Sequence, residues 1–556
     1  MLLLRAIIPY LFYIYHHTIC VEKDDRKRSF GKSAVLLAII GVLAKFIGAL
    51  YRVPLTNIVG AEGMGLYQMV FPLYTVLLAL CGGGIASAVS RVVAKYTALG
   101  DDGAARRVLR VAIVPLIGFS VVCTAGLILL RNIISGMQGN PDAAVAYIAI
   151  CPSLLFAGGI NIFRGYFQGK SNMVPSGISQ LFEQIIKLVL GLYLSRRLLP
   201  YGLKYAVAGA LIGVTASELT ALIYLGIRYA ISVRKKVRYI DVRAAYAETS
   251  AEFVVSHADD KTLRRELYAF AMSVTLGSLV LPVTQMIDSA LVINLLVYGG
   301  ATRADATALF GLFVGPVGTL INMPTVVVVS IAIAFLPAIT SAATKGEDAG
   351  KTVRSAANWI MLLVIPVTAV FLLFPDRVVG ALYTSGLTEY ELDMAARLLR
   401  VQALSVFYIG VLQLSTAILQ GYNKAHRPVI NLVIGACVKV ALTPLLVRAC
   451  GIVGAAGATA ACYAIAATLS TASAYKCNPF CASIADAFIK PISFTLIGAG
   501  AFWGCCELLK STSLSMFFQT AIAAAVFAVV YGALVLSSGA LGSGPHILKM
   551  LKKKKM

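Results

Sequence analysis

The sequence predicts an all-α, polytopic membrane protein with about fourteen transmembrane helices, in two six-helix lobes plus a C-terminal helix pair. Of 556 residues, 59% are hydrophobic, 13% are charged, and the mean hydropathy is +0.84. Soluble chains are roughly 45–50% apolar and 25% charged, so a soluble fold could not bury this much apolar surface. Apolar runs of about twenty residues, enough to cross a bilayer as helix, recur along nearly the whole chain.

The apolar runs give the expected spans in order. The N-terminal lobe, residues 31–231, contains 33–55, 64–90, 107–130, 143–165, 174–196 and 205–231. A polar segment, 232–262, is interpreted as a cytosolic linker. The C-terminal lobe, 263–476, contains 264–296, 305–341, 353–375, 394–420, 428–448 and 451–475. Residues 477–556 supply the last pair, 485–507 and 515–538, and a basic cytosolic tail.

Residues 1–30 form an apolar N-terminal segment and a basic cytosolic flank. The first twenty residues are apolar and aromatic, but Arg5, His16 and His17 interrupt them and no small-residue cleavage pattern follows. Three interpretations stay open: an interfacial segment, an over-long start, or a fifteenth span.

Basic residues predict the topology. The net charge of +23 comes from Lys and Arg that lie mostly in alternate gaps between apolar runs, which is typical of membrane topology and not of nucleic-acid binding. Arg106 and Arg107 are in one rich gap, whereas the gap at 57–62 has no basic residue. By the positive-inside rule, the rich gaps and both ends of the fourteen-helix core are cytosolic. The gap with Arg196, Arg197 and Lys204 is the exception.

The two halves share short motifs in the same order. Gln168-Gly169 returns as Gln420-Gly421, and Lys187 returns as Lys439, both 252 residues later. This spacing predicts two repeats with the same in-out sense, a design in which transporters bind substrate between lobes that rock.

Charged residues inside the spans are the candidate site. A charge at the centre of a membrane helix costs about 2.5–3.5 kcal/mol on insertion scales, so such residues usually face the bundle interior and serve function. The basic members suit an anionic substrate, and the acidic members suit charge pairing or ion coupling. The candidates are Lys45, Arg52, Arg91, Lys187 and Lys439 for substrate, and Glu183 and Asp288 for coupling or pairing.

Structural alternatives exist for most of these residues. Glu183 and Lys187 are four residues apart on one helix and would neutralise each other. Arg52 is near the outer end of its helix and could snorkel to the interface, and Arg91, like Arg164, is at a cytosolic end where topology accounts for it. Asp288 has no cation within a helical turn, so its partner must be an ion or a residue of another helix.

No pattern for catalysis or a cofactor is present. Gly31-Lys32-Ser33 ends like a phosphate-binding loop, but Arg26 stands where the first glycine is needed. The five His are scattered without metal-ligand spacing. We therefore expect a transporter and not an enzyme, with no cofactor, and with any uphill transport coupled to H⁺, Na⁺ or the membrane potential.

Several motifs resemble the polysaccharide-transport family that includes stage V sporulation protein B. They are LYRVPL at 50–55, GAEGMGLYQ at 60–68, GIASAVSR at 84–91, RGYFQG at 164–169 and QMID at 285–288. The resemblance begins near residue 30 and places the chain in the multidrug/oligosaccharidyl-lipid/polysaccharide exporter superfamily, with lipid II flippases and multidrug antiporters. It implies a fourteen-helix, two-lobe fold and alternating access in the bacterial cytoplasmic membrane. In lipid II flippases the first helices carry essential arginines, and only Arg52 and Arg91 match them in kind.

The substrate that the resemblance implies is an undecaprenyl-pyrophosphate-linked saccharide or a peptidoglycan precursor, flipped outward. The first alternative is a cation-coupled multidrug antiporter, which would need a net anionic, aromatic cavity. The second is a scaffold that recruits cell-wall synthesis enzymes. The expected partners are the anionic lipid-linked glycan, membrane lipid and, under the scaffold hypothesis, those enzymes. We expect no nucleic acid partner and a functional monomer.

Overall fold

The structure is a computed structural model that describes residues 26–99, 101–244, 260–477 and 485–538. In this part of the chain the secondary structure is helical, with no strand. The first group of helices is α2 (Arg26–Leu78), the π-helical turn η1 (Ala79–Gly83), α3 (Ile85–Ala98), α4 (Asp102–Met137), α5 (Ala143–Gly169), α6 (Val174–Leu198), the 3₁₀ turn η2 (Leu199–Tyr201) and α7 (Leu203–Ala244).

The second group begins after residue 259. It contains α8 (Asp260–Ser278), α9 (Val280–Tyr298), α10 (Arg303–Leu312), the π-helical turn η3 (Phe313–Val317), α11 (Gly318–Lys345), α12 (Gly350–Leu373), α13 (Pro375–Tyr383), α14 (Glu389–Gly421), α15 (His426–Cys450) and α16 (Ile452–Tyr475). The last helices are η4 (Ala485–Ile489), α17 (Lys490–Leu509) and α18 (Met516–Ser537).

The number of membrane crossings agrees with the prediction. Among the described residues, 12 helical stretches are long and apolar enough to span a bilayer. The first stretch, Ile40–Ala98, contains two crossings because the chain turns at Gly60, whose φ of 68° and ψ of −171° are not helical. The shorter apolar helix Pro282–Tyr298 adds one more. The predicted all-α polytopic membrane fold with about fourteen spans is confirmed.

Two expected ranges differ from the structure, and other expected segments lie outside the residues that the structure describes. The range 264–296 is two helices, because the chain turns at Leu279 and Pro282 in the first turn of α9 has no N–H to continue α8. The first part of the expected linker, 232–244, extends α7. Residues 1–20, linker residues 245–259 and the basic tail lie outside the described residues.

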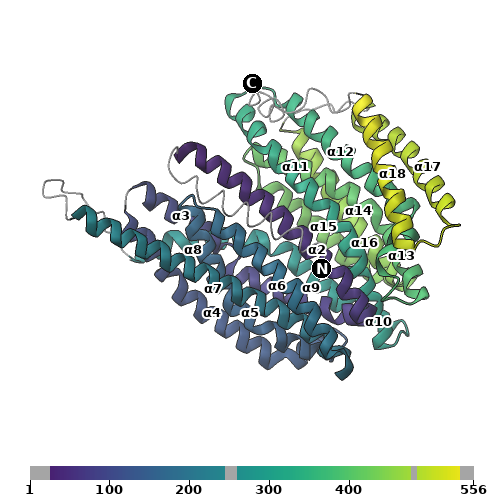
Figure 1. The fold of residues 1–556 in the computed structure, drawn as a ribbon, viewed down its shortest axis with the longest axis horizontal. Helices are drawn as coiled ribbons and strands as arrows, with labels where there is room; N and C mark the ends of the chain where they lie inside the picture. The colour runs from purple at the N-terminus through teal and green to yellow at the C-terminus, as the bar shows by residue number, and fades with distance from the viewer. Residues whose placement is uncertain (1–25, 100, 245–259, 478–484, 539–556) are drawn as a thin grey trace.

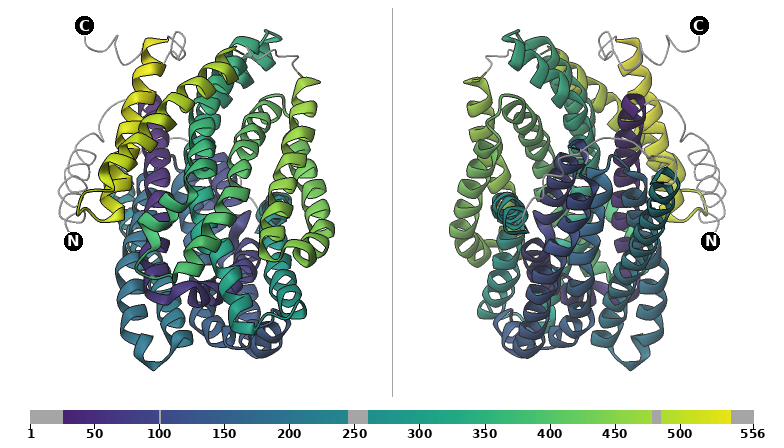
Figure 2. Two further views of the ribbon diagram at one scale, coloured as in Figure 1. Left: turned by 90° about the vertical axis from the view of Figure 1, so that its right-hand side faces the viewer. Right: turned by 90° about the vertical axis from the view of Figure 1, so that its left-hand side faces the viewer.

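The helices form two packed groups (Figures 1 and 2). In Figure 1, α3 to α7 lie at the lower left, and α11 to α18 lie at the upper right. Helix α8 packs on α3, α4 and η1, and so joins the first group in space. The pair α17 and α18 packs on α12 and α13 at the outer flank of the second group.

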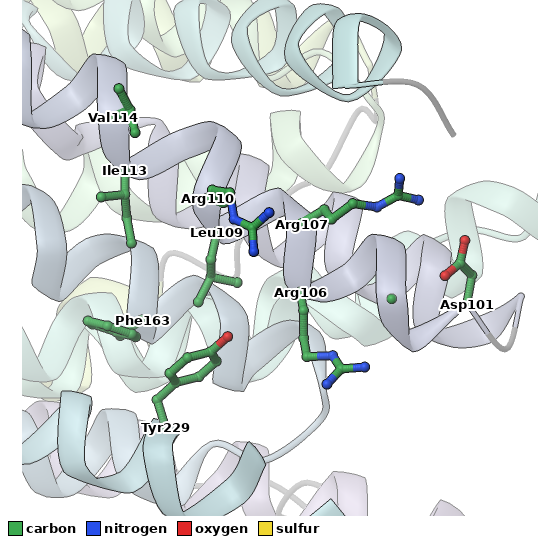
Figure 3. A pocket seen from close by; sticks show the side chains of 10 residues that line it. Asp101, Arg106, Arg107, Leu109, Arg110, Ile113, Val114, Phe163 and Tyr229 are labelled. Carbon is green, nitrogen blue, oxygen red and sulfur yellow. The ribbon is translucent and has the colours of Figure 1, made fainter. Parts of the chain in front are cut away.

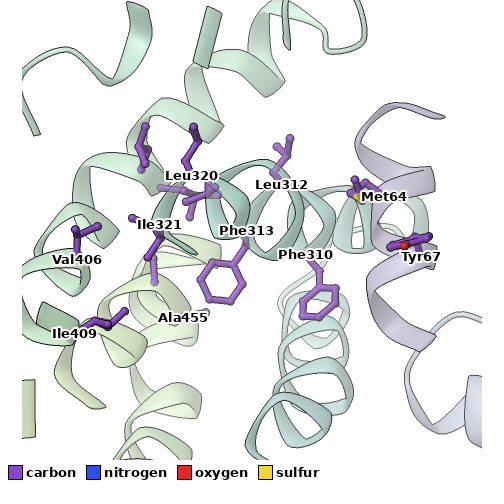
Figure 4. Close-up of a cluster of buried hydrophobic side chains, with 14 of the residues drawn as sticks. Met64, Tyr67, Phe310, Leu312, Phe313, Leu320, Ile321, Val406, Ile409 and Ala455 are labelled. Atoms are coloured by element: carbon purple, nitrogen blue, oxygen red, sulfur yellow. The ribbon is translucent and has the colours of Figure 1, made fainter. Parts of the chain in front are cut away.

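The two groups meet where α2 contacts α10 and η3, a contact we name the α2–α10 seam. Figure 4 shows Met64 and Tyr67 of α2 near Phe310 at this contact, all buried. The backbones approach closely: a Cβ added to Gly311 would be 2.1 Å from the Ala61 carbonyl oxygen. Since the gap at 57–62 is the one without basic residues, the seam is on the side that we predict to be extracytoplasmic.

Polar side chains tie the groups together at the same end. Gln138, just after α4, donates from Nε2 to the Met69 carbonyl at 3.0 Å and to Ser289 Oγ at 3.1 Å. Asn140 Nδ2 donates to Thr307 Oγ1 at 3.0 Å. Both amides are buried, so losing either partner would leave an unsatisfied polar group in the seam.

Candidate substrate and coupling site

Each group of helices contains one ionic cluster, of which the first is half-buried and the second is buried. In the first group, Arg164 of α5 and Glu183 of α6 form an ion pair with 2.7 Å between Nη2 and Oε2. Arg164 Nε also donates to Ser179 Oγ at 2.9 Å. Glu183 therefore pairs with Arg164 and not with Lys187, and a residue that topology seemed to account for becomes part of the site. Sequence spacing favoured the local pair because the α5–α6 contact could not be read from it.

Lys187 of α6 has no ion-pair partner among the described residues. Its ammonium lies over the Tyr51 ring of α2, 5.5 Å from the centroid, and within electrostatic range of Glu183, Arg52 and Glu218. Helix α2 comes close here because Gly48 has no side chain: a Cβ there would be 2.7 Å from Gln184 Oε1 and 3.8 Å from Lys187 Nζ. The glycine leaves room for the cation against the helix.

Glu218 of α7 is a functional candidate that the sequence analysis missed. Its side chain is 6% exposed, and Oε1 accepts a hydrogen bond from the hydroxyl of Tyr74 of α2. The signal was available, because an acidic residue in the apolar range 205–231 meets the criterion that selected the other candidates. Arg164, Glu183 and Lys187 all lie within electrostatic range of it.

Buried polar atoms beside these charges lack partners. Tyr51 Oη, Gln184 Oε1 and Glu218 Oε2 have no hydrogen-bond partner in the described part of the chain. Such an atom costs about 1–3 kcal/mol when left unpaired in a protein interior. Atoms of this kind around Lys187 are suited to accept water, a proton, a cation or a polar part of a substrate.

The second cluster is in the other group of helices. Lys439 of α15 donates to Asp288 of α9, and both side chains are about nine-tenths buried. The predicted inter-helix partner of Asp288 is thus Lys439, the repeat mate of Lys187. A cavity of about 30 Å³ beside Lys439, lined by Thr284, Cys462 and Tyr463 among others, holds roughly one water-sized group.

The remaining predicted residues lie on α2 and α3. Lys45 of α2 is exposed. Arg52 is half-buried and within electrostatic range of the hydroxyls of Tyr67 and Tyr383, so it reaches toward α13 of the other group. Arg91 of α3 is exposed, with its guanidinium 4.7 Å from the centre of the Phe270 ring of α8.

The chemistry of the site follows from these contacts. Two ion pairs, Arg164–Glu183 and Asp288–Lys439, balance their own charges. Three cations then remain, Lys45, Arg52 and Lys187, with one further acidic residue, Glu218. The α2–α6 face is therefore cationic, and it also contains an acid that can take up a proton or a cation.

The chain matches known transporters over most of its length. Residues 30–343 match the family described as polysaccharide biosynthesis protein, and residues 274–445 match the MatE family. Stage V sporulation protein B of Bacillus subtilis (strain 168) is 27% identical over 479 residues, which cover 85% of this chain and 88% of that protein. Lipid II flippase MurJ of the same organism is 25% identical over 447 residues, which cover 76% of this chain and 78% of that protein.

A solved structure of lipid II flippase MurJ, in an inward closed conformation, shares the fold. Its TM-score is 0.63 with 14% sequence identity, and the alignment covers 91% of this chain and 99% of that one. This similarity shows that the two chains share a fold over most of their length.

Proposed function

Because this chain belongs to the polysaccharide biosynthesis protein family, we propose that it is a flippase for an undecaprenyl-pyrophosphate-linked saccharide or a peptidoglycan precursor. It moves this anionic lipid outward across the bacterial cytoplasmic membrane by alternating access. Its similarity to a lipid II flippase in sequence and fold supports this class of cargo. The chain would supply binding and movement, with no covalent chemistry.

The cationic α2–α6 face carries the proposal. Lys187 sits over Tyr51 with no ion-pair partner in the described chain, and Arg52 acts on it electrostatically. These two cations are half-buried and within electrostatic range of each other, an arrangement that favours a multivalent anion such as a pyrophosphate. Lys45 lies nearer the start of α2 than Arg52, on the exposed part of the helix, where it would meet the cargo first.

The two acidic positions have separate proposed roles. Asp288 holds Lys439 in a closed pair, which suits a structural link between α9 and α15 within the second group of helices. Glu218 has a free buried oxygen, so it is the better position for a coupling H⁺ or Na⁺. Glu183, which we expected to couple or pair, acts as the partner of Arg164.

The α2–α10 seam supports an inward-facing assignment for this conformation. Along α2, Lys45, Phe46 and Leu50 are exposed, whereas Leu55 and Val59 nearer Gly60 are buried. Contact between the lobes at that end would close the outer side while cargo enters from the cytosolic leaflet. Opening the seam would release the cargo outside.

The test is the accessibility of lipid II in cells depleted of their native flippase and producing this protein, with exposed precursor cleaved by an added toxin. We expect cleavage to be restored by the natural chain. In cells producing the variant Arg52→Gln/Lys187→Gln, cleavage should be lost. We expect it to fall by roughly tenfold or more for each charge-assisted hydrogen bond to the cargo that is removed. The control Lys345→Gln/Lys351→Gln removes two exposed cations at the end of α11 and the start of α12, and cleavage should be kept. Normal cleavage of the precursor in cells producing Arg52→Gln/Lys187→Gln would contradict the assignment of the site.

A cation-coupled multidrug antiporter is the second candidate, and the MatE match over residues 274–445 favours it. On this hypothesis Glu218 and the Asp288–Lys439 pair would couple ion entry to drug exit. Cells overproducing the protein would then resist norfloxacin or ethidium, and Glu218→Gln would remove the resistance. Restored lipid II cleavage without drug resistance would reject it.

A further inference from the structure

A cavity of about 610 Å³ lies on the first group of helices, between α4, α5 and α7. Its size is in the range of small-molecule sites. It is apart from the α2–α6 face, since its walls come from the start of α4, from Phe163 of α5 and from Tyr229 of α7. Figure 3 shows its apolar side chains to the left and the charged ends of its arginines to their right.

One part of the wall is strongly cationic. Arg106, Arg107 and Arg110 line it within the first turns of α4. Lys170, just after α5, is close enough for Arg106 to act on it: burial, and then the charge of Arg106, lower the pKa of the Lys170 ammonium. The acidic residue of the lining, Asp101, is engaged as the cap of α4, where Oδ1 accepts from Ala104 N at 2.7 Å. Positive charge is therefore in excess.

The rest of the wall is apolar. Phe163 and Tyr229 pack with ring centroids 5.4 Å apart, and Ile113 and Val114 continue the lining along α4. Val114 is 69% exposed on a membrane-spanning helix, so this side opens toward the lipid. A soluble phosphate would leave the apolar part of the wall unused.

The cavity's place in the molecule also points to lipid. The rich basic gap with Arg106 and Arg107 is on the side that the positive-inside rule assigns to the cytosol. Helix α4 packs on α3, α5 and α8, and lies at the edge of the first group in Figure 1. The cavity therefore faces the inner leaflet, where anionic headgroups attract arginine clusters.

We propose that this cavity binds an anionic phospholipid of the inner leaflet, with its phosphate against Arg107 and Arg110 and its upper acyl chain along Ile113, Val114 and Phe163. The site is separate from the cargo site, and the inference does not depend on which glycan is carried. Bound lipid would join the start of α4 to α5 and α7, and so stabilise the cytosolic end of this group.

The experiment is native mass spectrometry of the full-length, detergent-purified chain, titrated with phosphatidylglycerol or with phosphatidylcholine of the same acyl chains. Arg107→Gln/Arg110→Gln should lower the affinity for the first bound phosphatidylglycerol molecule roughly 30-fold, which is equivalent to about 1 kcal/mol for each of the two cations. Arg107→Lys/Arg110→Lys should restore most of the affinity. Arg106 is left unchanged because it takes part in other interactions.

The controls separate a site from general surface charge. Arg196→Gln/Arg197→Gln removes two exposed arginines at the end of α6 and should leave phosphatidylglycerol binding unchanged. Glycerophosphoglycerol, the headgroup without acyl chains, should not compete at matched concentration. The proposal is overturned if Arg107→Gln/Arg110→Gln binds phosphatidylglycerol as tightly as the natural chain does, or if the control variant loses as much affinity. It is also overturned if the headgroup alone or inorganic phosphate competes as well as the lipid.

Discussion

At the scale of single residues, the same type of side chain takes different roles according to its partners. Lys187 and Lys439 occupy matching places in the two repeats, yet Lys439 is paired with Asp288 and Lys187 has no ion-pair partner among the described residues. A buried pair contributes little net stability, but breaking it leaves an uncompensated charge. On the function that we propose, one of these cations serves structure and the other binds an anionic substrate.

The Asp288–Lys439 pair gives the first prediction at this scale. Lys439→Met should destabilise the protein by about 3–5 kcal/mol, because Asp288 stays buried without its cation. Thermal unfolding of the purified chain in detergent measures this effect. The double variant Asp288→Leu/Lys439→Met should recover most of the loss.

The matched control is the exposed pair Lys510–Glu507, with 2.6 Å between Nζ and Oε1. Lys510→Met should change stability by about 1 kcal/mol or less, because water screens both charges. An Lys439→Met variant as stable as Lys510→Met would show that Asp288 is not held as a charge.

Glu218 gives the second prediction. Glu218→Gln keeps a side chain that can accept from Tyr74, so folding should be retained while proton or cation binding is lost. In proteoliposomes the flipping rate of this variant should no longer respond to an imposed pH or Na⁺ gradient, and the natural chain should respond. Glu507→Gln, an exposed change in α17, is the control. If the flipping rate of Glu218→Gln still responds to the gradient, Glu218 is not the residue that binds the coupling ion.

At the scale of helices, the α2–α10 seam is a close contact between two backbones. The α2–α10 seam needs small residues, since a side chain at Gly311 would meet the backbone of α2 at Ala61. Buried amides such as Gln138 and Asn140 then fix the register between the groups. Such a contact is either made or broken, which suits a two-state gate.

The seam predicts the effect of one substitution. Gly311→Val should prevent closure and shift the protein to the outward-open state, because its Cβ has no space while the seam is made. Spin labels at Tyr201 and Tyr298, exposed residues of the first and second groups, should report a longer distance than in the natural chain. Gly118→Val in α4, where an added Cβ has no neighbour within 4 Å, should leave the distance unchanged.

At the scale of the whole molecule, topology follows from where the positive charges are. The prediction is that a cysteine at Ser171, between α5 and α6, reacts only from the cytosol, and one at Thr302, between α9 and α10, only from outside. Both positions are exposed. A membrane-impermeant maleimide on whole cells and on inverted vesicles measures this, in a chain whose native cysteines are replaced by alanine. Labelling of both positions from the same side would refute the topology.

The sequence by itself determined the class of fold, because bilayer thickness sets the length of an apolar helix and insertion energy makes each charge in a span conspicuous. On that basis Lys187, Asp288 and Lys439 could be selected, and Glu218 could have been. The resemblance of motifs such as GAEGMGLYQ to a known family indicated the family of the chain, as the family match over residues 30–343 confirms.

Tertiary structure alone decided which of these charges meet. Glu183 is four residues from Lys187 but pairs with Arg164 of another helix, and Asp288 pairs with Lys439, 151 positions away. The Gly311–Ala61 contact likewise depends on how the helices pack. Spacing along one helix fixes which side chains share a face, whereas the rotation and approach of neighbouring helices come from packing of the whole bundle.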